Sequence, residues 1–287
     1  MKTFCIKTNN TKIIDYLINE LENLTIDNVY YCSKKFKIYK NVIIHYTGQY
    51  ISIFEHTLAD ILTNCILAFY EENLINRLLN FNYFYFDSFE KKQIKNKCIN
   101  SLYKNTDDFY YRKDTLWLCV YNYLMEYNKM ILQGFVNFRI AGYLKILDYL
   151  TDICVNNYVI EKEYNEFIDL LKIYINSKSP SDKIIHLIYR KKDSILLDNN
   201  KNIIVKSKEN FNAKFLSDIS FSDNDYILNT LLNILPKKIN IHLLTSSDDF
   251  INTLNLIFED RIQICDDCTL CRAYKILEDT RSFKSSK

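Results

Sequence analysis

The sequence INIHLLTSSDDFINTLNLIFEDRIQICDDCTLC, residues 239–271, decides the fold of the C-terminal part of this 287-residue chain. Its first residues, 239–243, alternate between apolar and polar side chains, as a strand does. Ser247 is a good N-cap residue for the amphipathic helix that follows. A second strand is expected at Arg261–Cys265, and the 16 residues that separate it from Leu244 are enough for a parallel strand–helix–strand crossover.

The boundary of this region lies at residues 176–182, where Pro180 stands among Ser and Asn residues. Ser222 and Asp225 have the spacing of a capping box at the start of a helix. Before that helix the pattern alternates and predicts three short antiparallel strands, at 184–189, 194–197 and 202–205. We therefore expect a C-terminal α/β domain over 179–271, followed by a tail, 272–287.

Residues 56–178 carry apolar side chains at three- and four-residue steps, the spacing of helices that pack on a core. One long helix is expected from Leu132 to Leu150. A separate helix is expected after Val159, because Glu161 and Glu163 suit a helix N-terminus.

Residues 1–55 predict a small α/β unit, with alternating stretches on either side of a helix over 11–24. The predicted fold class is therefore α+β. A mostly helical central region, 56–178, is flanked by this N-terminal unit and by the C-terminal mixed α/β domain with its β-α-β unit.

The residues with the sharpest chemical signal are Cys265, Cys268 and Cys271, a C-x2-C-x2-C run. This spacing lets three thiolates converge on one ion from a tight loop. Zinc takes four such ligands in a tetrahedron, and iron–sulfur clusters also accept three nearby cysteines and a distant fourth. The sequence therefore predicts a zinc or iron–sulfur site, with a redox dithiol or unmetallated structural thiols as the alternatives.

A fourth ligand is missing from the local sequence. By residue type the candidates are His242, His186, Cys154 and Cys5, while Asp266 and Asp267 inside the loop are second choices beside thiolates. The six cysteines outside the run are scattered singly, and most of them are expected to be buried apolar residues.

Arg139 lies midway between Phe135 and Tyr143 in the stretch FVNFRIAGY, which puts a guanidinium on or beside an apolar stripe. A buried arginine needs a carboxylate partner, and Glu163 or Glu166 on the next helix could supply one. The expected role is an interhelical ion pair that fixes packing. The functional alternative is an anion or partner site built around Arg139.

The bulk composition excludes several classes. A net charge of +2, with 11 basic against 13 acidic residues over 179–271, lacks the footprint of a nucleic-acid-binding domain. We find neither a run that predicts membrane insertion nor a signal peptide, so we expect a cytoplasmic protein with reduced thiols. With three glycines and no recognised catalytic spacing, phosphate-loop and hydrolase motifs are absent.

Several stretches together resemble the YtxC-like family, which is named for sporulation proteins of endospore-forming bacteria. They are FVNFRIAGY, EKEYNEFIDLLKIYI, IIHLIY, LLNILPKKINIH and IFEDRIQICDDCTLC, and the resemblance covers roughly residues 60–271. It implies a role connected with spore formation in a low-GC host. It implies no activity, cofactor or catalytic residue.

These observations favour a non-enzymatic, cytoplasmic accessory protein of sporulation. On this hypothesis the cysteine loop holds a structural metal or cluster, and the aromatic-rich helices offer a surface to a protein partner. The alternative is a metal- or thiol-dependent enzyme or redox protein that acts through Cys265, Cys268 and Cys271, since a catalytic metal keeps an open coordination position.

Overall fold

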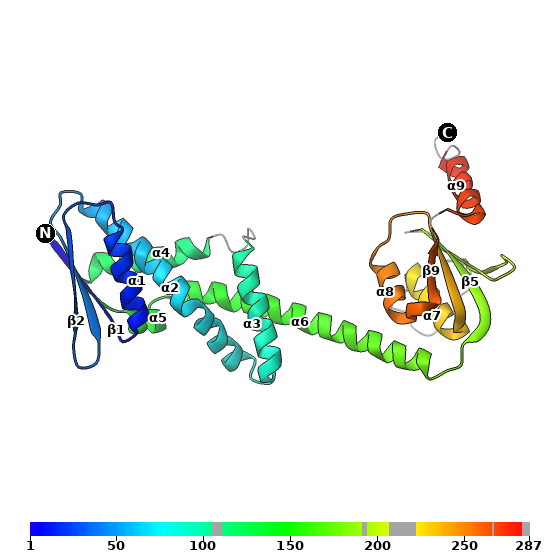
Figure 1. Cartoon of the computed structure of the whole chain (residues 1–287), viewed down its shortest axis with the longest axis horizontal. Coiled ribbons are helices and arrows are strands. Elements are labelled where there is room, and N and C mark those ends of the chain that lie inside the picture. The colour runs from blue at the N-terminus through cyan, green and yellow to red at the C-terminus, as the bar shows by residue number, and fades with distance from the viewer. Residues whose placement is uncertain (105–110, 191–193, 207–221, 266, 283–287) are drawn as a thin grey trace. The chain divides into compact units, whose positions relative to one another are not determined.

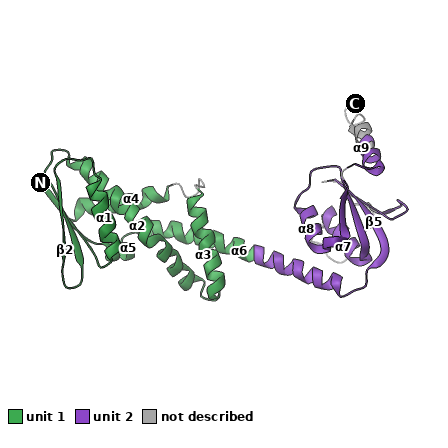
Figure 2. Ribbon diagram, in the orientation of Figure 1, with its two compact units in different colours: residues 1–160 green, residues 161–287 purple. Residues whose placement is uncertain are grey.

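The structure, a computed structural model, describes residues 1–104, 111–190, 194–206, 222–265 and 267–282. The chain divides into two compact units, residues 1–160 and 161–287 (Figure 1, Figure 2). The division falls inside one long helix, α6 (Ala141–Asn176). The two units are therefore described one at a time.

The first unit contains a four-stranded sheet in the order β2-β3-β1-β4. The pairs β1–β3 and β2–β3 are antiparallel, whereas β1–β4 is parallel. Phe4, Ile6 and Thr8 are buried and the residues between them are half-exposed, because successive side chains of a strand point to opposite faces. The strands are β1 (Lys2–Thr8), β2 (Val29–Lys35), β3 (Lys40–Tyr46) and β4 (Lys129–Ile131).

Helices supply the rest of this unit, and one hydrophobic core runs from Phe4 to Tyr158. Asp87 and Glu90 form the capping box that starts α3. The helices are α1 (Thr11–Glu22), α2 (Ile51–Asn82), α3 (Ser88–Tyr103), α4 (Arg112–Glu126), α5 (Leu132–Phe138) and the first part of α6.

Among the helices in the described ranges, α2 alone has the length and apolar composition that a membrane span requires. Half of its most apolar window is buried inside the structure. Its buried residues include Leu58, Leu62 and Ile66, which belong to the core of the first unit. A core helix passes the same test of length and composition as a membrane span.

The predicted α+β class with a helical central region is confirmed, but the helix boundaries differ at two places. The helix expected from Leu132 to Leu150 breaks at Arg139 and Ile140, between α5 and α6. The helix expected to begin after Val159 is instead the continuation of α6, which runs unbroken to Asn176. Glu161 and Glu163 lie inside a helix because no proline or glycine interrupts the chain between Gly142 and Asn176.

The second unit contains a five-stranded sheet in the order β7-β6-β5-β8-β9. The strands β5, β8 and β9 are parallel, which confirms the predicted crossover, and the hairpin β6–β7 adds two antiparallel strands. The strands are β5 (Ser181–Tyr189), β6 (Ile195–Leu197), β7 (Ile203–Lys206), β8 (Pro236–Leu243) and β9 (Ile262–Cys265).

Three helices pack into the core on one face of this sheet: α7 (Asp223–Ile234), α8 (Asp249–Phe258) and the C-terminal part of α6, through Ile168 and Ile175. The predicted capping box of Ser222 and Asp225 starts α7, whereas α8 is capped by Asp248 and not by the expected Ser247. Leu235 ends α7 in a left-handed conformation, and Pro236 cannot continue a helix.

After β9 the chain forms α9 (Thr269–Ser282), within a segment expected mostly as a tail. The turn Glu259–Arg261 leads from α8 into β9, so that β8, α8 and β9 follow one another with short connections.

Candidate metal centre

The first two residues of the site are neighbours across the parallel strands β8 and β9. His242 pairs in register with Cys265, and Ile241 with Ile264. Ile239 and Ile241 are fully buried in the core under α7 and α8. Since alternate residues point to opposite faces, His242 and Cys265 both project from the other face of the sheet.

The other two residues come from the loop after β9 and from the first turn of α9. Cys268 precedes the first residue of α9, and Cys271 is the third residue of that helix. The backbone N–H of Cys271 points at the Cys268 sulfur, 3.5 Å away, and the N–H of Arg272 donates to the Cys268 carbonyl at 3.0 Å. The helical turn therefore brings both thiols back toward the end of β9.

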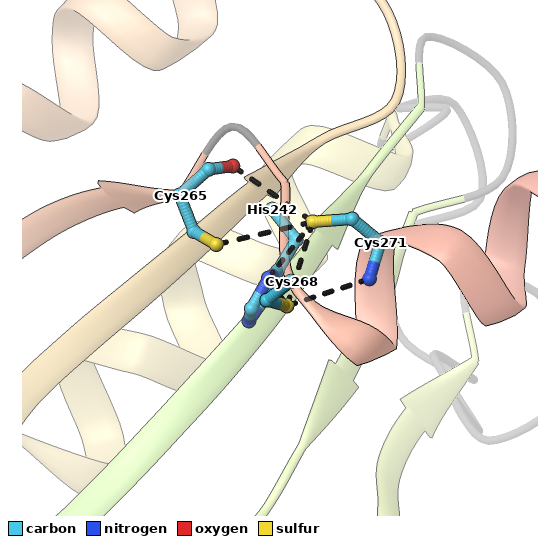
Figure 3. A group of neighbouring side chains, drawn as sticks. All are labelled: His242, Cys265, Cys268 and Cys271. Carbon is cyan, nitrogen blue, oxygen red and sulfur yellow. Dashed lines mark hydrogen bonds between the residues drawn. The ribbon is translucent and has the colours of Figure 1, made fainter.

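These four side chains converge on one point (Figure 3). The Nδ1 atom of His242 lies 3.3 Å from the Cys271 sulfur and 3.4 Å from the Cys268 sulfur. The sulfur of Cys271 lies 3.7 Å from that of Cys268 and 4.0 Å from that of Cys265. All four donor atoms lie within 4.8 Å of one another, a group that could hold a metal ion. His242 thus stands where the sequence left a fourth ligand open.

A second histidine, His186, contacts the imidazole of His242. The Nδ1 atom of His186, on β5, lies 3.0 Å from the Nε2 atom of His242, and the two rings stack with centroids 5.2 Å apart. If the Nδ1 lone pair of His242 binds a metal, its Nε2–H donates this bond and fixes the ring orientation. The sequence proposed His186 only as a ligand by type; the structure makes it the partner of His242.

Burial and neighbouring groups shift the pKa values of three of the four residues. Burial, followed by the charge of His186, lowers the pKa of His242, so its imidazole is neutral near pH 7. Burial and then contacts with Cys268 and Cys271 raise the pKa of Cys265 to about 11. Burial also acts on Cys268, but hydrogen bonds from the backbone of Cys271, the neighbouring thiols and the backbone of Leu270 lower its pKa on balance. Once the thiols lose their protons, one neutral imidazole and three thiolates form a donor set typical of zinc sites.

Exposure differs among the four converging residues. Cys271 is fully buried and His242 is 3 % exposed, whereas Cys265 and Cys268 are half-buried. His242 and Cys265 belong to strands of the sheet, whereas Cys268 and Cys271 belong to the loop after β9 and to α9, so the four residues link the sheet to the start of the helix.

Other contacts tie the same helix to the sheet. Arg190 follows β5 and donates from Nη2 to the carbonyl oxygen of Tyr274 on α9, at 2.9 Å. Its guanidinium also lies over the Tyr274 ring, 5.9 Å from the centroid. Asp267 and Arg272 pair at 2.8 and 3.1 Å across the loop. The Arg190 contacts thus join α9 to the end of β5, and the Asp267–Arg272 pair joins the loop after β9 to the first turn of α9.

Of the remaining candidate ligands, Asp266 lies outside the described residues, and the others lie away from the four converging side chains. Cys5 is on β1, and Cys154 is buried on α6 beside Cys98 and Ser101, so both belong to the first unit. Asp267 binds Arg272 and is not one of the four converging residues.

The residues predicted for an ion pair are placed differently from the expectation. Arg139 is exposed after α5, where its backbone N–H donates to the Phe135 carbonyl. Glu166 lies 4.0 Å from Lys162 on its own helix. Within the described ranges no ion pair joins Arg139 to Glu163 or Glu166, because α6 is one helix and carries both glutamates many turns beyond Arg139.

Residues 56–263 match the YtxC-like family. The chain belongs to the YtxC-like family. It is also 22 % identical to the protein "Uncharacterized protein YtxC" of Bacillus subtilis (strain 168), over 211 residues that make up 71 % of this chain and 74 % of that protein. No solved structure matches the chain.

The part of the chain that matches the YtxC-like family includes the paired histidines, His186 and His242. It ends two residues before Cys265. The cysteine run therefore lies just beyond the matched residues, while the strands that position it lie within them.

Proposed function

We propose that this YtxC-like chain is a cytoplasmic, non-enzymatic accessory protein of sporulation, and that its second unit is stabilised by one zinc ion bound to His242, Cys265, Cys268 and Cys271. The connection with spore formation and the cytoplasm rests on the family and on the sequence. The metal rests on the geometry of the four donors.

One observation carries the choice of a single zinc ion: the spacing of the donor atoms. Thiolate and imidazole ligands placed tetrahedrally at zinc distances lie about 3.5–3.8 Å from one another. The four spacings described above run from 3.3 to 4.0 Å. An iron–sulfur cluster binds its protein ligands through different iron atoms and needs them farther apart. The donor spacing therefore favours one ion over a cluster.

The same geometry favours a structural role. Four protein ligands complete a tetrahedron, whereas a catalytic zinc keeps a position for water or substrate. The ligands also join two strands to the loop and helix that follow them, so binding one ion would fasten α9 to the sheet. Structural zinc contributes its binding free energy to folding.

Elemental analysis of the full-length protein, purified without oxygen, tests this proposal. We expect one zinc per chain, and expect Cys271→Ser to reduce it while Cys32→Ser, at an exposed thiol of β2, leaves it unchanged. If the protein contains iron and acid-labile sulfide instead, the site holds an iron–sulfur cluster and the zinc assignment is wrong. Protein that is folded but free of metal would overturn the site.

The proposed role in spore formation has its own test. Deleting the gene in its host should reduce the yield of heat-resistant spores, and the wild-type gene should restore it. Normal spore yield and timing in the deletion strain would contradict this part of the proposal and leave the metal site untouched.

A protein partner is the further component of this proposal. Four aromatic side chains at the turn between α2 and α3 are exposed to solvent: Phe81, Phe84, Tyr85 and Phe89, at 64–83 %. Exposed aromatic clusters are common at protein interfaces. Complementation of the deletion with a gene encoding Phe84→Ser and Tyr85→Ser should fail, although the purified variant folds and holds zinc.

The alternative is a redox or thiol-dependent function at the same residues. Cys268 is half-buried and the pKa of its thiol is lowered, which increases the thiolate fraction that reacts with oxidants or electrophiles. This alternative predicts that Cys268→Ser folds normally and abolishes the cellular function. A structural site predicts that the same variant loses stability.

A further inference from the structure

The hairpin formed by β2 and β3 carries a concentrated positive charge at its tip. The sequence from residue 33 to residue 41 is SKKFKIYKN, with lysines at 34, 35, 37 and 40. No acidic residue occurs between Asp27 and Glu55. The tip thus differs from the rest of a chain whose net charge is only +2.

The register of the hairpin makes this charge unfavourable for folding. Lys35 lies directly opposite Lys40, and the next pair toward the strand ends is Lys34 with Asn41. Like charges directly opposite each other on antiparallel strands are destabilising. Among the described residues, none of the four lysines makes an ion pair. Their arrangement therefore points to a negatively charged ligand outside the chain.

Two apolar side chains stand among these lysines. Ile38 is 75 % exposed and Phe36 is 49 % exposed. The backbone N–H of Phe36 donates to the carbonyl of Tyr39 at 2.8 Å, so the turn that presents them is closed by a hydrogen bond. The ammonium of Lys34 lies 5.8 Å from the centroid of the Phe36 ring. A hydrogen-bonded turn thus presents two exposed apolar side chains among four lysines.

We propose that the tip of the β2–β3 hairpin binds the surface of an anionic lipid bilayer. Phe36 and Ile38 enter the boundary between headgroups and acyl chains, and the four lysines contact lipid phosphates. Lysine suits this role because its long stem can lie along apolar groups while its ammonium stays at the polar surface. This attachment is peripheral, crosses no bilayer and is independent of the metal centre.

A lipid surface fits the tip better than a nucleic acid does. Both ligands would attract the lysines. Single-stranded nucleic acids, however, bind through bases stacked on aromatic rings, and the most exposed apolar side chain at this tip is the aliphatic Ile38. An acyl boundary gives an isoleucine a favourable environment, whereas a phosphate backbone does not.

Co-sedimentation of the full-length protein with vesicles tests the proposal. We expect it to sediment with vesicles of equal parts phosphatidylcholine and phosphatidylglycerol, and not with phosphatidylcholine alone. Binding should weaken as salt is added, because salt screens the attraction. Replacing one tip lysine by glutamine should weaken binding about fivefold, which is the contribution of one lysine to the affinity for an anionic membrane surface.

The variants separate charge from apolar contact. Phe36→Ser with Ile38→Ser should weaken binding although the net charge is unchanged. A variant with all four tip lysines replaced by glutamine should lose most of the binding. Its matched control replaces four exposed lysines elsewhere, Lys12, Lys92, Lys113 and Lys183, by glutamine and should leave most of the binding intact. Circular dichroism of each variant checks that the fold is retained.

Three results would overturn the proposal. The first is no sedimentation of the folded protein with anionic vesicles. The second is an equal loss of binding in the control and in the variant that lacks the four tip lysines. The third is binding of a labelled oligonucleotide that depends on the tip lysines, without binding to vesicles, which would assign the hairpin to nucleic acid.

Discussion

His242 and Cys265 occupy the same register position on the adjacent parallel strands β8 and β9. Their side chains therefore project from the same face of the sheet, opposite α7 and α8. This one relationship places the imidazole beside the cysteine run, although 22 residues separate the two in sequence. The candidate metal centre is thus a consequence of the crossover between the two strands.

Replacing Cys265 by serine removes one of the four donors and should release zinc. We expect the affinity to fall by more than the roughly 10–100-fold that changes in outer-shell residues cause. The thermal midpoint of the second unit should fall with it, since metal binding and folding are coupled. Metal analysis and thermal unfolding measure both effects, and unchanged zinc content in Cys265→Ser would contradict the assignment of this ligand.

Much of the second unit could be predicted from sequence, because its strands and helices have clear periods and caps. The alternation of Ile239, Ile241 and Leu243 already implied that His242 faces away from the core. His242 could be suggested as the fourth ligand by residue type alone, because the register between β8 and β9 that brings it beside Cys265 is not readable from the sequence. The contact between His186 and His242 likewise depends on the register between the parallel strands β5 and β8.

The helix break at Arg139 could not be predicted from the sequence for a different reason. The two residues at the break, Arg139 and Ile140, are not helix breakers, and the helical spacing of the apolar residues continues through them. The expected pairing of Arg139 with Glu163 or Glu166 depended on a turn between two helices that α6 does not contain. The local sequence pattern therefore predicts neither the break between α5 and α6 nor the continuity of α6.

His186→Phe should weaken zinc binding about 10–100-fold without changing the stoichiometry, because the partner that orients His242 is lost while all four ligands remain. Competition with a chromophoric chelator measures the affinity. His186→Gln retains an acceptor for the His242 Nε2–H and should recover part of it. Equal affinities of wild type and His186→Phe would show that the 3.0 Å contact does not orient the ligand.

Zinc affinity should fall as the pH falls from about 8 to about 6, because the thiols must lose protons to bind the metal. The raised pKa of Cys265, about 11, keeps this thiol protonated throughout that range when no metal is bound, so its proton is released on binding. Each released proton makes the affinity about tenfold weaker per unit of decreasing pH. The lowered pKa of His242 means that the imidazole releases none. Isothermal titration in buffers of different ionisation enthalpy counts the protons, and a pH-independent affinity would contradict thiolate ligation.

Stability of the first unit should depend on a buried polar group, Glu71 on α2. Its Oε1 atom accepts a hydrogen bond from the Tyr143 hydroxyl and lies 3.3 Å from Nε of Arg112. The Glu71 and Arg112 side chains are only 7 % and 15 % exposed. Glu71→Ala leaves the arginine without its counter-charge and should destabilise the unit by about 3–5 kcal/mol. Tyr143→Phe leaves the ion pair intact and should cost about 1–3 kcal/mol. Glu72, also on α2, has an exposed carboxylate that pairs with Lys95 of α3, and Glu72→Gln should cost less than about 1 kcal/mol. Urea unfolding followed by circular dichroism orders the three variants, and a Glu71→Ala protein as stable as Glu72→Gln would show that the buried group does not hold this unit together.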